Sequence, residues 1–210
     1  MVEAFRDIDP GRLRANLEAV RGDAGPGVEI LVAGKYVPVE EMGTLAEAGV
    51  TLVGENRLGD LQAKRERWGD AFEWDFIGNL QSRKVRDVLP SVRLIHSVWS
   101  EGVIDQLARH ASHETEVLVQ VNVAGEEGKG GVAPAGLAEL LERCPARVVG
   151  LSTMPPFAAD PEASRPWFAA LAELAAEHAL EQLSMGTSQD WRVAVAEGAT
   201  TIRLGSALFA

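Results

Sequence analysis

A lysine and two glycine- and hydroxyl-rich stretches are the parts of this chain best suited to chemistry. Lys35 closes the apolar run at residues 30–33. Its ammonium group would sit at the margin of a low-dielectric core, where its proton is easier to remove. Residues 184–188 (SMGTS) and 203–206 (RLGS) combine glycines with hydroxyl groups. Glycine lets a backbone N–H approach a ligand closely and hydroxyls add donors, which suits a phosphate group.

Each feature also has a purely structural explanation. A lysine after a strand often only begins a solvated loop, because lysine side chains are mostly exposed. Glycines often only allow the chain to turn. The choice depends on whether the fold brings the lysine and the two stretches together.

Short apolar segments alternate with helix-sized segments along the chain. The predicted strands are residues 28–34, 51–54, 74–78, 93–96, 117–123, 148–151, 182–185 and 200–204, of which 117–123 is the longest. The predicted helices are residues 9–22, 39–48, 58–68, 81–89, 100–111, 134–141, 163–180 and 191–197. Asp9 as N-cap and Pro10 at the first helical position suit the start of the first helix. Strict alternation indicates a parallel sheet.

Eight such units with no reversal of strand order favour a closed (β/α)8 barrel with an extra N-terminal helix. We expect residues 1–210 to form this single domain. The alternative is an open Rossmann- or flavodoxin-like sheet. That fold calls for a glycine-rich turn after the first strand, whereas residues 33–39 (AGKYVPV) contain one glycine.

In such a barrel the chemistry lies at the C-terminal ends of the strands. Besides the two stretches above, the polar or flexible residues at these ends are Lys35, Glu55, Asn56, Gly78, Gln81, His96, Ser97, Asn122 and Met154. The loops after strands seven and eight form the usual phosphate site, here with a short helix at 207–209. Closure places strand eight beside strand one, so a phosphate-bearing aldehyde could span the two. Pyridoxal phosphate has this shape.

Composition narrows the function classes. Of 210 residues, 46% are hydrophobic and 24% charged, and the net charge is −11 without a basic cluster, which argues against nucleic-acid binding. Cys144 is the single cysteine, so no intrachain disulfide can form and a reducing compartment is expected. The N-terminus lacks the apolar core of a secretory signal and no segment suits a membrane span. We therefore expect a cytoplasmic protein without a membrane partner.

The chain also resembles the pyridoxal phosphate homeostasis protein family, which is similar to the N-terminal barrel of alanine racemase. The segments that carry the resemblance are LVAGKYVP, VGENR, WDFIGNLQSRK, LIHSV, VQVNVAGEEGKGG, GLSTMPP, LSMGTSQDW and TIRLGSALF. They run through nearly the whole chain. The resemblance implies pyridoxal 5'-phosphate as cofactor, a role in its buffering or delivery, and PLP-dependent apo-enzymes as partners of a monomer.

The resemblance also implies a set of cofactor-binding residues. The Schiff base forms at Lys35, and Arg203 faces the pyridine nitrogen. Asn56 lies on the same rim and contacts the ring side. The phosphate contacts implied are Ser184, Gly186, Ser188, Gly205 and Ser206. No metal site is implied.

The sequence departs from the family at several positions. Ser206 replaces a threonine but keeps the hydroxyl. Asp75 stands where the family usually has a histidine, a difference compatible with a position at the surface. The other departures are Gly34, Arg83, Trp99, Ser152 and Thr187.

The arginine favours a cofactor holder over an enzyme. A guanidinium is always charged and accepts no proton, so the ring nitrogen stays unprotonated and the cofactor is a weak electron sink. Alanine racemase takes a second base, a tyrosine, from a C-terminal domain, and this chain ends at Ala210. Its tyrosine, Tyr36, follows the lysine directly and suits local packing.

Two enzyme classes remain as alternatives. One is a PLP-dependent amino-acid racemase. The other is an aldolase or isomerase acting on phosphorylated sugars, for which Glu55 would be the base. Lys129 lies between glycines, which suits either a mobile loop or a secondary phosphate contact.

Overall fold

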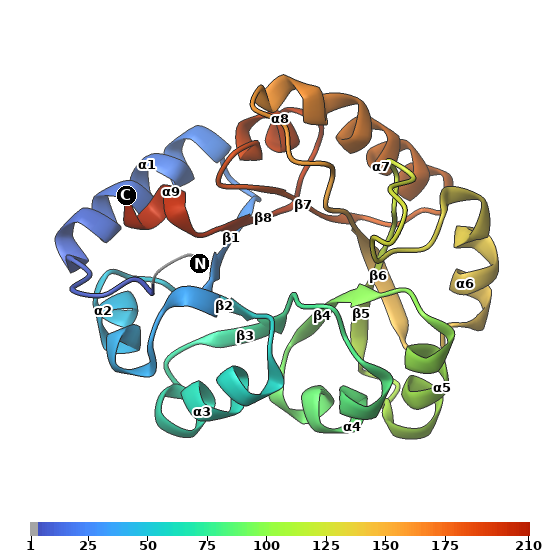
Figure 1. Cartoon of the computed structure of the whole chain (residues 1–210), viewed down its shortest axis with the longest axis horizontal. Coiled ribbons are helices and arrows are strands. Elements are labelled where there is room, and N and C mark those ends of the chain that lie inside the picture. Colours follow the sequence, from blue (N-terminus) through green and yellow to red (C-terminus); the bar gives the residue numbers. More distant parts are fainter. Residues whose placement is uncertain (1–3) are drawn as a thin grey trace.

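Parallel strands pair in sequence order and close into a barrel (Figure 1). The computed structural model describes residues 4–210. Its strands are β1 (Glu29–Ala33), β2 (Leu52–Glu55), β3 (Glu73–Phe76), β4 (Leu94–Val98), β5 (Glu116–Gln120), β6 (Arg147–Ser152), β7 (Gln182–Thr187) and β8 (Thr201–Leu204). The predicted barrel is confirmed, and the open doubly wound sheet is wrong because β8 pairs with β1.

Helices surround the barrel as an outer ring (Figure 1). They are α1 (Pro10–Ala24), α2 (Met42–Glu47), α3 (Leu58–Trp68), α4 (Val85–Val88), α5 (Glu101–His110), α6 (Leu137–Arg143), α7 (Arg165–Glu177), α8 (Trp191–Ala196) and α9 (Ser206–Phe209). The extra N-terminal helix is α1. Asp9 caps it by accepting hydrogen bonds from the N–H groups of Gly11 and Arg12, and Pro10 occupies its first turn.

Several sequence-based predictions differ from the structure in length, and the helix at 81–89 and the strand at 117–123 are two of them. The segment at 81–89 is a short helix between the 3-10 turns Ser82–Lys84 and Leu89–Ser91. The strand predicted at 117–123 ends at Gln120 and is shorter than β6 and β7. Beyond it, Asn122 exchanges side-chain hydrogen bonds with the backbone N–H and C=O of Glu126, at 3.2 and 2.9 Å. These bonds compete with strand pairing and turn the chain.

The register at barrel closure places the lysine turn beside the last loop. Leu31 pairs with Arg203 and Val32 with Leu204. Continuing this register brings Ala33 opposite Gly205, and a Cβ on Gly205 would lie 3.9 Å from that of Ala33. Lys35 and the loop after β8 therefore share one edge of the barrel, as predicted.

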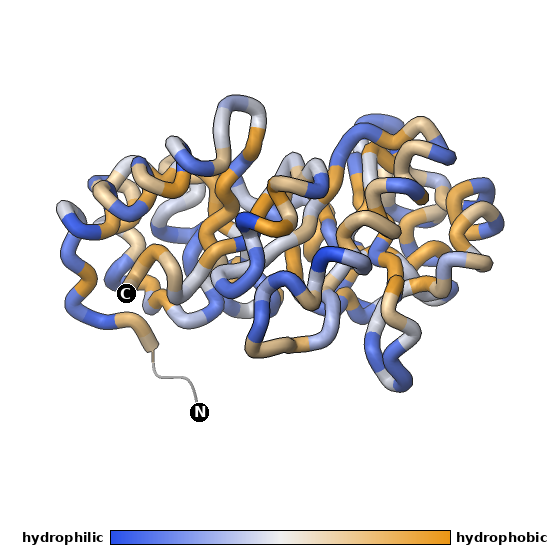
Figure 2. The backbone as a smooth tube through the Cα atoms, turned by 90° about the horizontal axis from the view of Figure 1, so that it is seen from above, coloured by the Kyte–Doolittle hydropathy of each residue, from blue (hydrophilic) through white to orange (hydrophobic). Residues whose placement is uncertain are grey.

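The apolar core lies between the strands and the helices. Figure 2 shows hydrophobic stretches through the body of the molecule and hydrophilic ones in many peripheral loops. The barrel interior is different, because buried polar side chains gather there: Asp75, His96, Ser152, Ser184 and Arg203. Across residues 4–210, no helix combines the length and apolar character that crossing a membrane requires.

Candidate functional site

Lys35 lies on a 3-10 turn, Gly34–Tyr36, that directly follows β1. Its side chain is exposed, and its Nζ is 4.7 Å from the centre of the Tyr36 ring. The N–H of Phe5 donates to the Tyr36 carbonyl at 2.8 Å, and the two rings meet edge to face at 6.3 Å. Tyr36 thus packs against the N-terminal segment, while the amine of Lys35 remains accessible at the rim.

A buried ion pair lies beneath this turn. Lys64 of α3 donates to Glu55 Oε1 and, at 2.8 Å, to the carbonyl of Gly34. Both side chains are almost fully buried. Burial raises the pKa of Glu55, although the charge and hydrogen bond of Lys64 oppose this rise. Through Lys64, Glu55 helps to hold the turn that carries Lys35. A carboxylate that is buried and paired in this way is not favoured as the base of the aldolase alternative.

Asn56 follows Glu55 at the end of β2. Among the described residues, Asn56 Oδ1 and Glu55 Oε2 are the buried side-chain oxygen or nitrogen atoms without a hydrogen-bond partner. A buried polar atom without a partner is costly, so such an atom at a rim is a candidate contact for a ligand. Gly78 packs against this segment so closely that a Cβ would lie 2.2 Å from the Asn56 carbonyl oxygen.

Hydrogen-bond donors converge where β7 and β8 end. Ser188 Oγ accepts from the N–H groups of Gly205 and Ala207, at 3.0 and 3.1 Å, and Ser206 is exposed beside them. We call Ser188, Gly205, Ser206 and Ala207 the donor cluster. Ser188 Oγ accepts from the two N–H groups and its hydroxyl can still donate, and hydroxyl donors beside the start of a helix suit an anion. The cluster lies on the edge that carries Lys35.

Gly186 shapes the loop that presents Ser188. Its φ is +89°, and a Cβ there would lie 2.6 Å from the Ala194 Cβ, so only glycine fits. Asp190 then fixes the loop by accepting from the N–H and hydroxyl of Thr187, at 2.8 and 3.1 Å.

Ser184 does not lie in this cluster. It is fully buried, and its hydroxyl contacts His96 Nδ1 at 2.8 Å and Arg203 Nη1 at 2.7 Å inside the barrel. The sequence predicts this hydroxyl as a phosphate contact, whereas in the structure it lies inside the barrel between His96 and Arg203. The reason is that β7 extends to Thr187, so position 184 lies within the strand, where alternate side chains point into the barrel.

Arg203 is held from both sides inside the barrel mouth. Nη1 donates to the Ser184 carbonyl at 2.8 Å, and Nη2 donates to the Thr153 carbonyl at 2.7 Å and contacts Met154 Sδ at 3.0 Å. Burial lowers the pKa of Arg203 to about 10, with Asp190 opposing the shift, so the guanidinium remains a cation at neutral pH. Because a thioether is a weak acceptor, the Nη2 proton facing Met154 is the one most easily redirected to a ligand.

Asp75 is buried inside the barrel, so its interpretation as a surface change is wrong. Its Oδ2 contacts His96 Nε2 at 3.0 Å and Arg93 Nη2 at 2.9 Å. Burial alone would raise the pKa of Asp75, but the hydrogen bonds and charges of His96 and Arg93 outweigh it and lower the pKa. Burial also lowers the pKa of His96, against the attraction of Asp75. A carboxylate therefore faces a neutral imidazole.

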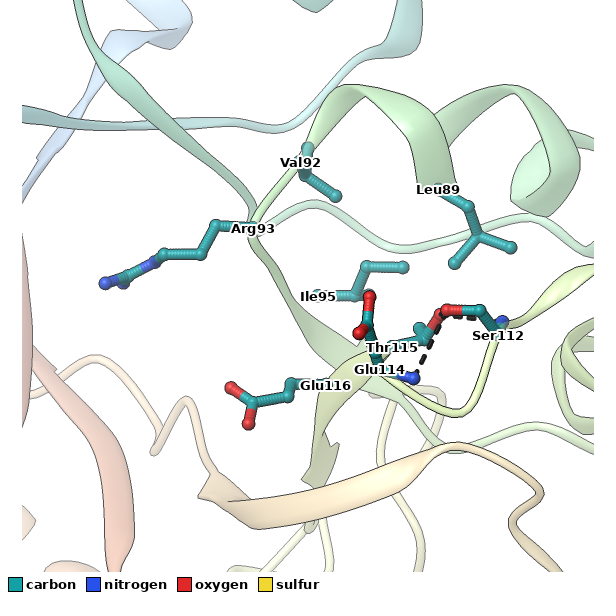
Figure 3. Close-up of a pocket in the computed structure, with 8 residues that line it drawn as sticks. All are labelled: Leu89, Val92, Arg93, Ile95, Ser112, Glu114, Thr115 and Glu116. Atoms are coloured by element: carbon teal, nitrogen blue, oxygen red, sulfur yellow. Dashed lines mark hydrogen bonds between the residues drawn. The ribbon is translucent and has the colours of Figure 1, made fainter.

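A pocket of about 160 Å³ lies at the opposite end of the barrel (Figure 3). It is lined where β4 and β5 begin, by Leu89, Val92, Arg93, Ile95, Ser112, Glu114, Thr115 and Glu116. The strands run from this end toward Lys35, so the pocket is separate from the rim described above. Within residues 4–210, no cluster of three His, Cys, Asp or Glu side chains is arranged to hold a metal ion.

Sequence reasoning missed Lys64, Arg93 and Thr153. Lys64 occupies a buried position of α3 three residues after Leu61, and a charge on an apolar helical stripe was the available signal. Thr153 acts through its backbone carbonyl, which no side-chain pattern reveals.

Comparison with known proteins shows which family this chain belongs to. A protein of Aquifex aeolicus named pyridoxal phosphate homeostasis protein is 42% identical over 195 residues, covering 86% of each chain. One of Vibrio cholerae with the same name is 34% identical over 205 residues, covering 90% of this chain and 87% of that one. The chain belongs to the pyridoxal phosphate homeostasis protein family. It also matches the family model "Alanine racemase, N-terminal domain" over residues 8–210.

Solved structures agree with this family assignment. PipY of Synechococcus elongatus PCC7942, solved with PLP bound, is 30% identical and superposes with a TM-score of 0.82, covering 94% of this chain and 100% of PipY. Alanine racemase of Corynebacterium glutamicum is 18% identical with a TM-score of 0.77, covering 96% of this chain and 60% of the racemase. The racemase match shows a shared fold, whereas PipY is a relative within the family.

Proposed function

We propose that this chain binds pyridoxal 5'-phosphate through Lys35 and buffers or delivers the cofactor without robust catalysis of its own. One observation carries the proposal: closure of the barrel puts an accessible lysine and the donor cluster on the same edge, at the ends of neighbouring strands. The family name and the PLP-bound PipY structure support it.

The residues present fit this cofactor, which supplies an aldehyde, a ring nitrogen and a phosphate. Lys35 would hold the aldehyde carbon, since condensation forms a C=N bond and releases one water. Ser188, Gly205 and Ser206 would hold the phosphate, with Gly186 shaping their loop. Asn56 Oδ1, buried and unpartnered, would contact the ring side. Ser184 would act indirectly, through Arg203.

Arg203 supports the holder over the racemase. Its guanidinium stays charged at neutral pH and has no acceptor atom, so it would leave the ring nitrogen unprotonated. Tyr36 packs against Phe5 and Lys35, which does not favour it as a second base. Purified protein should show no turnover with a panel of D- and L-amino acids; sustained racemisation would favour the alternative.

Lys35→Ala tests the binding proposal. The wild type should acquire the absorption band of lysine-bound cofactor and a borohydride-fixed label on the peptide containing Lys35. The variant should lose both, while Lys84→Ala, a control at a partly buried lysine, should keep both. Retention of band and label by Lys35→Ala would reject the assignment.

Transfer to PLP-dependent apo-enzymes is a separate part of the proposal. The loaded protein should reactivate an apo-enzyme in the presence of a scavenger of free cofactor, whereas free pyridoxal phosphate should not. If the scavenger suppressed reactivation equally with the loaded protein and with free pyridoxal phosphate, direct delivery would be rejected and buffering would remain. That the protein is monomeric and cytoplasmic is likewise proposed, and light scattering would test the first point.

A further inference from the structure

Hydrogen bonds connect the two ends of the barrel through its interior. Arg203 Nη1 lies 2.7 Å from Ser184 Oγ, Ser184 Oγ lies 2.8 Å from His96 Nδ1, and His96 Nε2 lies 3.0 Å from Asp75 Oδ2. Arg93 then contacts both carboxylate oxygens of Asp75, at 3.1 and 2.9 Å. We call these five residues the interior chain. They come from β8, β7, β4, β3 and the residue before β4.

The protonation of these groups determines which atom donates and which accepts in each hydrogen bond of the interior chain. An ionised Asp75 only accepts hydrogen bonds, so His96 must carry its proton on Nε2. Because the imidazole is neutral, Nδ1 is an acceptor and the Ser184 hydroxyl must donate to it. The Ser184 oxygen is then left to accept from Arg203. The ionised Asp75 carboxylate therefore determines the donor and the acceptor in each of these hydrogen bonds.

The far end of the interior chain is anchored. Arg93 makes a two-pronged contact with Asp75 and another with Glu29, at 2.8 and 3.1 Å. Hydrogen bonding to Glu29 raises the pKa of Arg93, and Asp75 contributes in the same direction against burial. In Figure 3 the Arg93 side chain extends away from Leu89 and Ser112. Its charge is directed to the carboxylates of Asp75 and Glu29, at the end of the barrel opposite Lys35.

Within the interior chain, only the Nη2 group of Arg203 can turn to a ligand. Its Nη1 is committed to the carbonyl and hydroxyl of Ser184, whereas Nη2 faces Thr153 and the weak acceptor Met154. We propose that Asp75 and His96 are positioning residues that act through Ser184, fixing the Arg203 guanidinium so that Nη2 is presented to the ring nitrogen of a bound pyridine. This inference rests on the proposed function for the identity of the ligand.

The protein without cofactor provides the first test. Nitrogen-15 NMR of the histidine rings, with His96 assigned through the loss of its signals in His96→Gln, should show the neutral Nε2–H form at pH 7. Ser184→Ala should perturb the Nδ1 shift. A Nδ1–H form or a charged imidazolium at pH 7 would overturn the proposal, whether or not any cofactor binds.

A double-mutant cycle provides the second test. Asp75→Asn should weaken binding of pyridoxal 5'-phosphate about fivefold or more in the wild-type background and have little effect in the Ser184→Ala background, because the connection is already broken there. Its affinity for inorganic phosphate should not change, since the donor cluster is untouched. Glu73→Gln, which contacts Arg93 at 3.5 Å, is the surface control and should leave both affinities unchanged.

The outcomes separate the two proposals. Equal effects of Asp75→Asn in both backgrounds, or equal losses for pyridoxal phosphate and inorganic phosphate, would reject positioning through Ser184. Absence of any pyridoxal phosphate binding by the wild type would reject the proposed function instead, and the histidine NMR would then decide on the interior chain.

Discussion

Lys64 Nζ donates a hydrogen bond to the carbonyl oxygen of Gly34 at 2.8 Å. Gly34 precedes the lysine of the rim, so helix α3 holds the peptide from which that lysine projects. The same ammonium neutralises Glu55, whose carboxylate is fully buried at the end of β2. One buried cation thereby links a helix to two neighbouring strands beneath the site.

Lys64→Met should destabilise the protein by about 3–5 kcal/mol, because it leaves the buried Glu55 carboxylate without its partner. The free energy of unfolding from urea titration, at pH 7, measures this change. The loss of the Gly34 contact should also slow borohydride labelling of Lys35, since the turn is less well fixed.

Two comparison variants test this explanation. In Lys64→Met with Glu55→Gln the unpaired charge is removed, so part of the stability should return. Arg86→Met breaks an exposed pair with Asp87 and should cost less than about 1 kcal/mol. A Lys64→Met variant as stable as the wild type would contradict a structural role for the buried pair.

Gly78→Ala should lower stability by about 1–3 kcal/mol, because the new Cβ would lie 2.2 Å from the Asn56 carbonyl oxygen and 2.6 Å from its Cα. Backbone cannot move aside as a flexible side chain can, so Asn56 should shift and cofactor affinity should fall as well. Gly22→Ala in α1 is the matched control. It meets nothing within 4 Å and should raise stability by about 0.5–1 kcal/mol. Thermal melts and equilibrium binding follow both effects.

The fold and the edge that carries the site follow from local patterns. Alternation of apolar and helical segments predicts parallel strands, and the C-terminal ends of those strands include Lys35, Asn56, Ser188 and Gly205. The position of each depends only on where a strand ends, which the sequence indicates to within a few residues. Closure then brings the first and last strands together without further information.

The interior of the barrel was not predictable in the same way. Whether Ser184 faces the rim or the interior depends on where β7 ends. The strand continues past Met185 through Gly186 and Thr187, and these two extra residues reverse the conclusion. The contact between His96 and Ser184 joins positions 88 apart in the chain. The local sequence gives no sign that Asp75 is buried, because its burial depends on two partners, His96 within β4 and Arg93 just before it. Tertiary packing decides such contacts, and local pattern does not contain them.

Stability should fall as the pH drops below about 6.5, the ordinary pKa of histidine. Burial lowers the pKa of His96 in the folded protein, so between that value and 6.5 the unfolded chain binds a proton that the folded one does not. Stability should therefore decrease by up to about 1.4 kcal/mol for each pH unit of acidification in this window. Asp75, whose pKa is also lowered, adds a further loss at lower pH.

His96→Gln isolates this contribution. Glu55 acts with the opposite sign, because its raised pKa gives stability at low pH that is lost as the pH rises. The difference between wild type and His96→Gln cancels the Glu55 contribution. Urea unfolding at pH 5, 6, 7 and 8 should show a smaller slope for the variant between pH 5 and 6.5; identical slopes would mean that His96 is charged or exposed in the folded state.

Ser188→Ala should weaken binding of both pyridoxal phosphate and inorganic phosphate by about tenfold to hundredfold, as expected for a hydrogen bond to a charged group. The Ser188 hydroxyl also fixes the N–H groups of Gly205 and Ala207, at 3.0 and 3.1 Å, so its loss should loosen the donor cluster. Lys35 is untouched, so saturating cofactor should still give the borohydride-fixed label.

Ser112→Ala, in the pocket at the opposite end of the barrel, is the control and should leave both affinities unchanged. Isothermal titration with each ligand measures the change. Unaltered phosphate affinity in Ser188→Ala would mean that the anion binds away from the donor cluster.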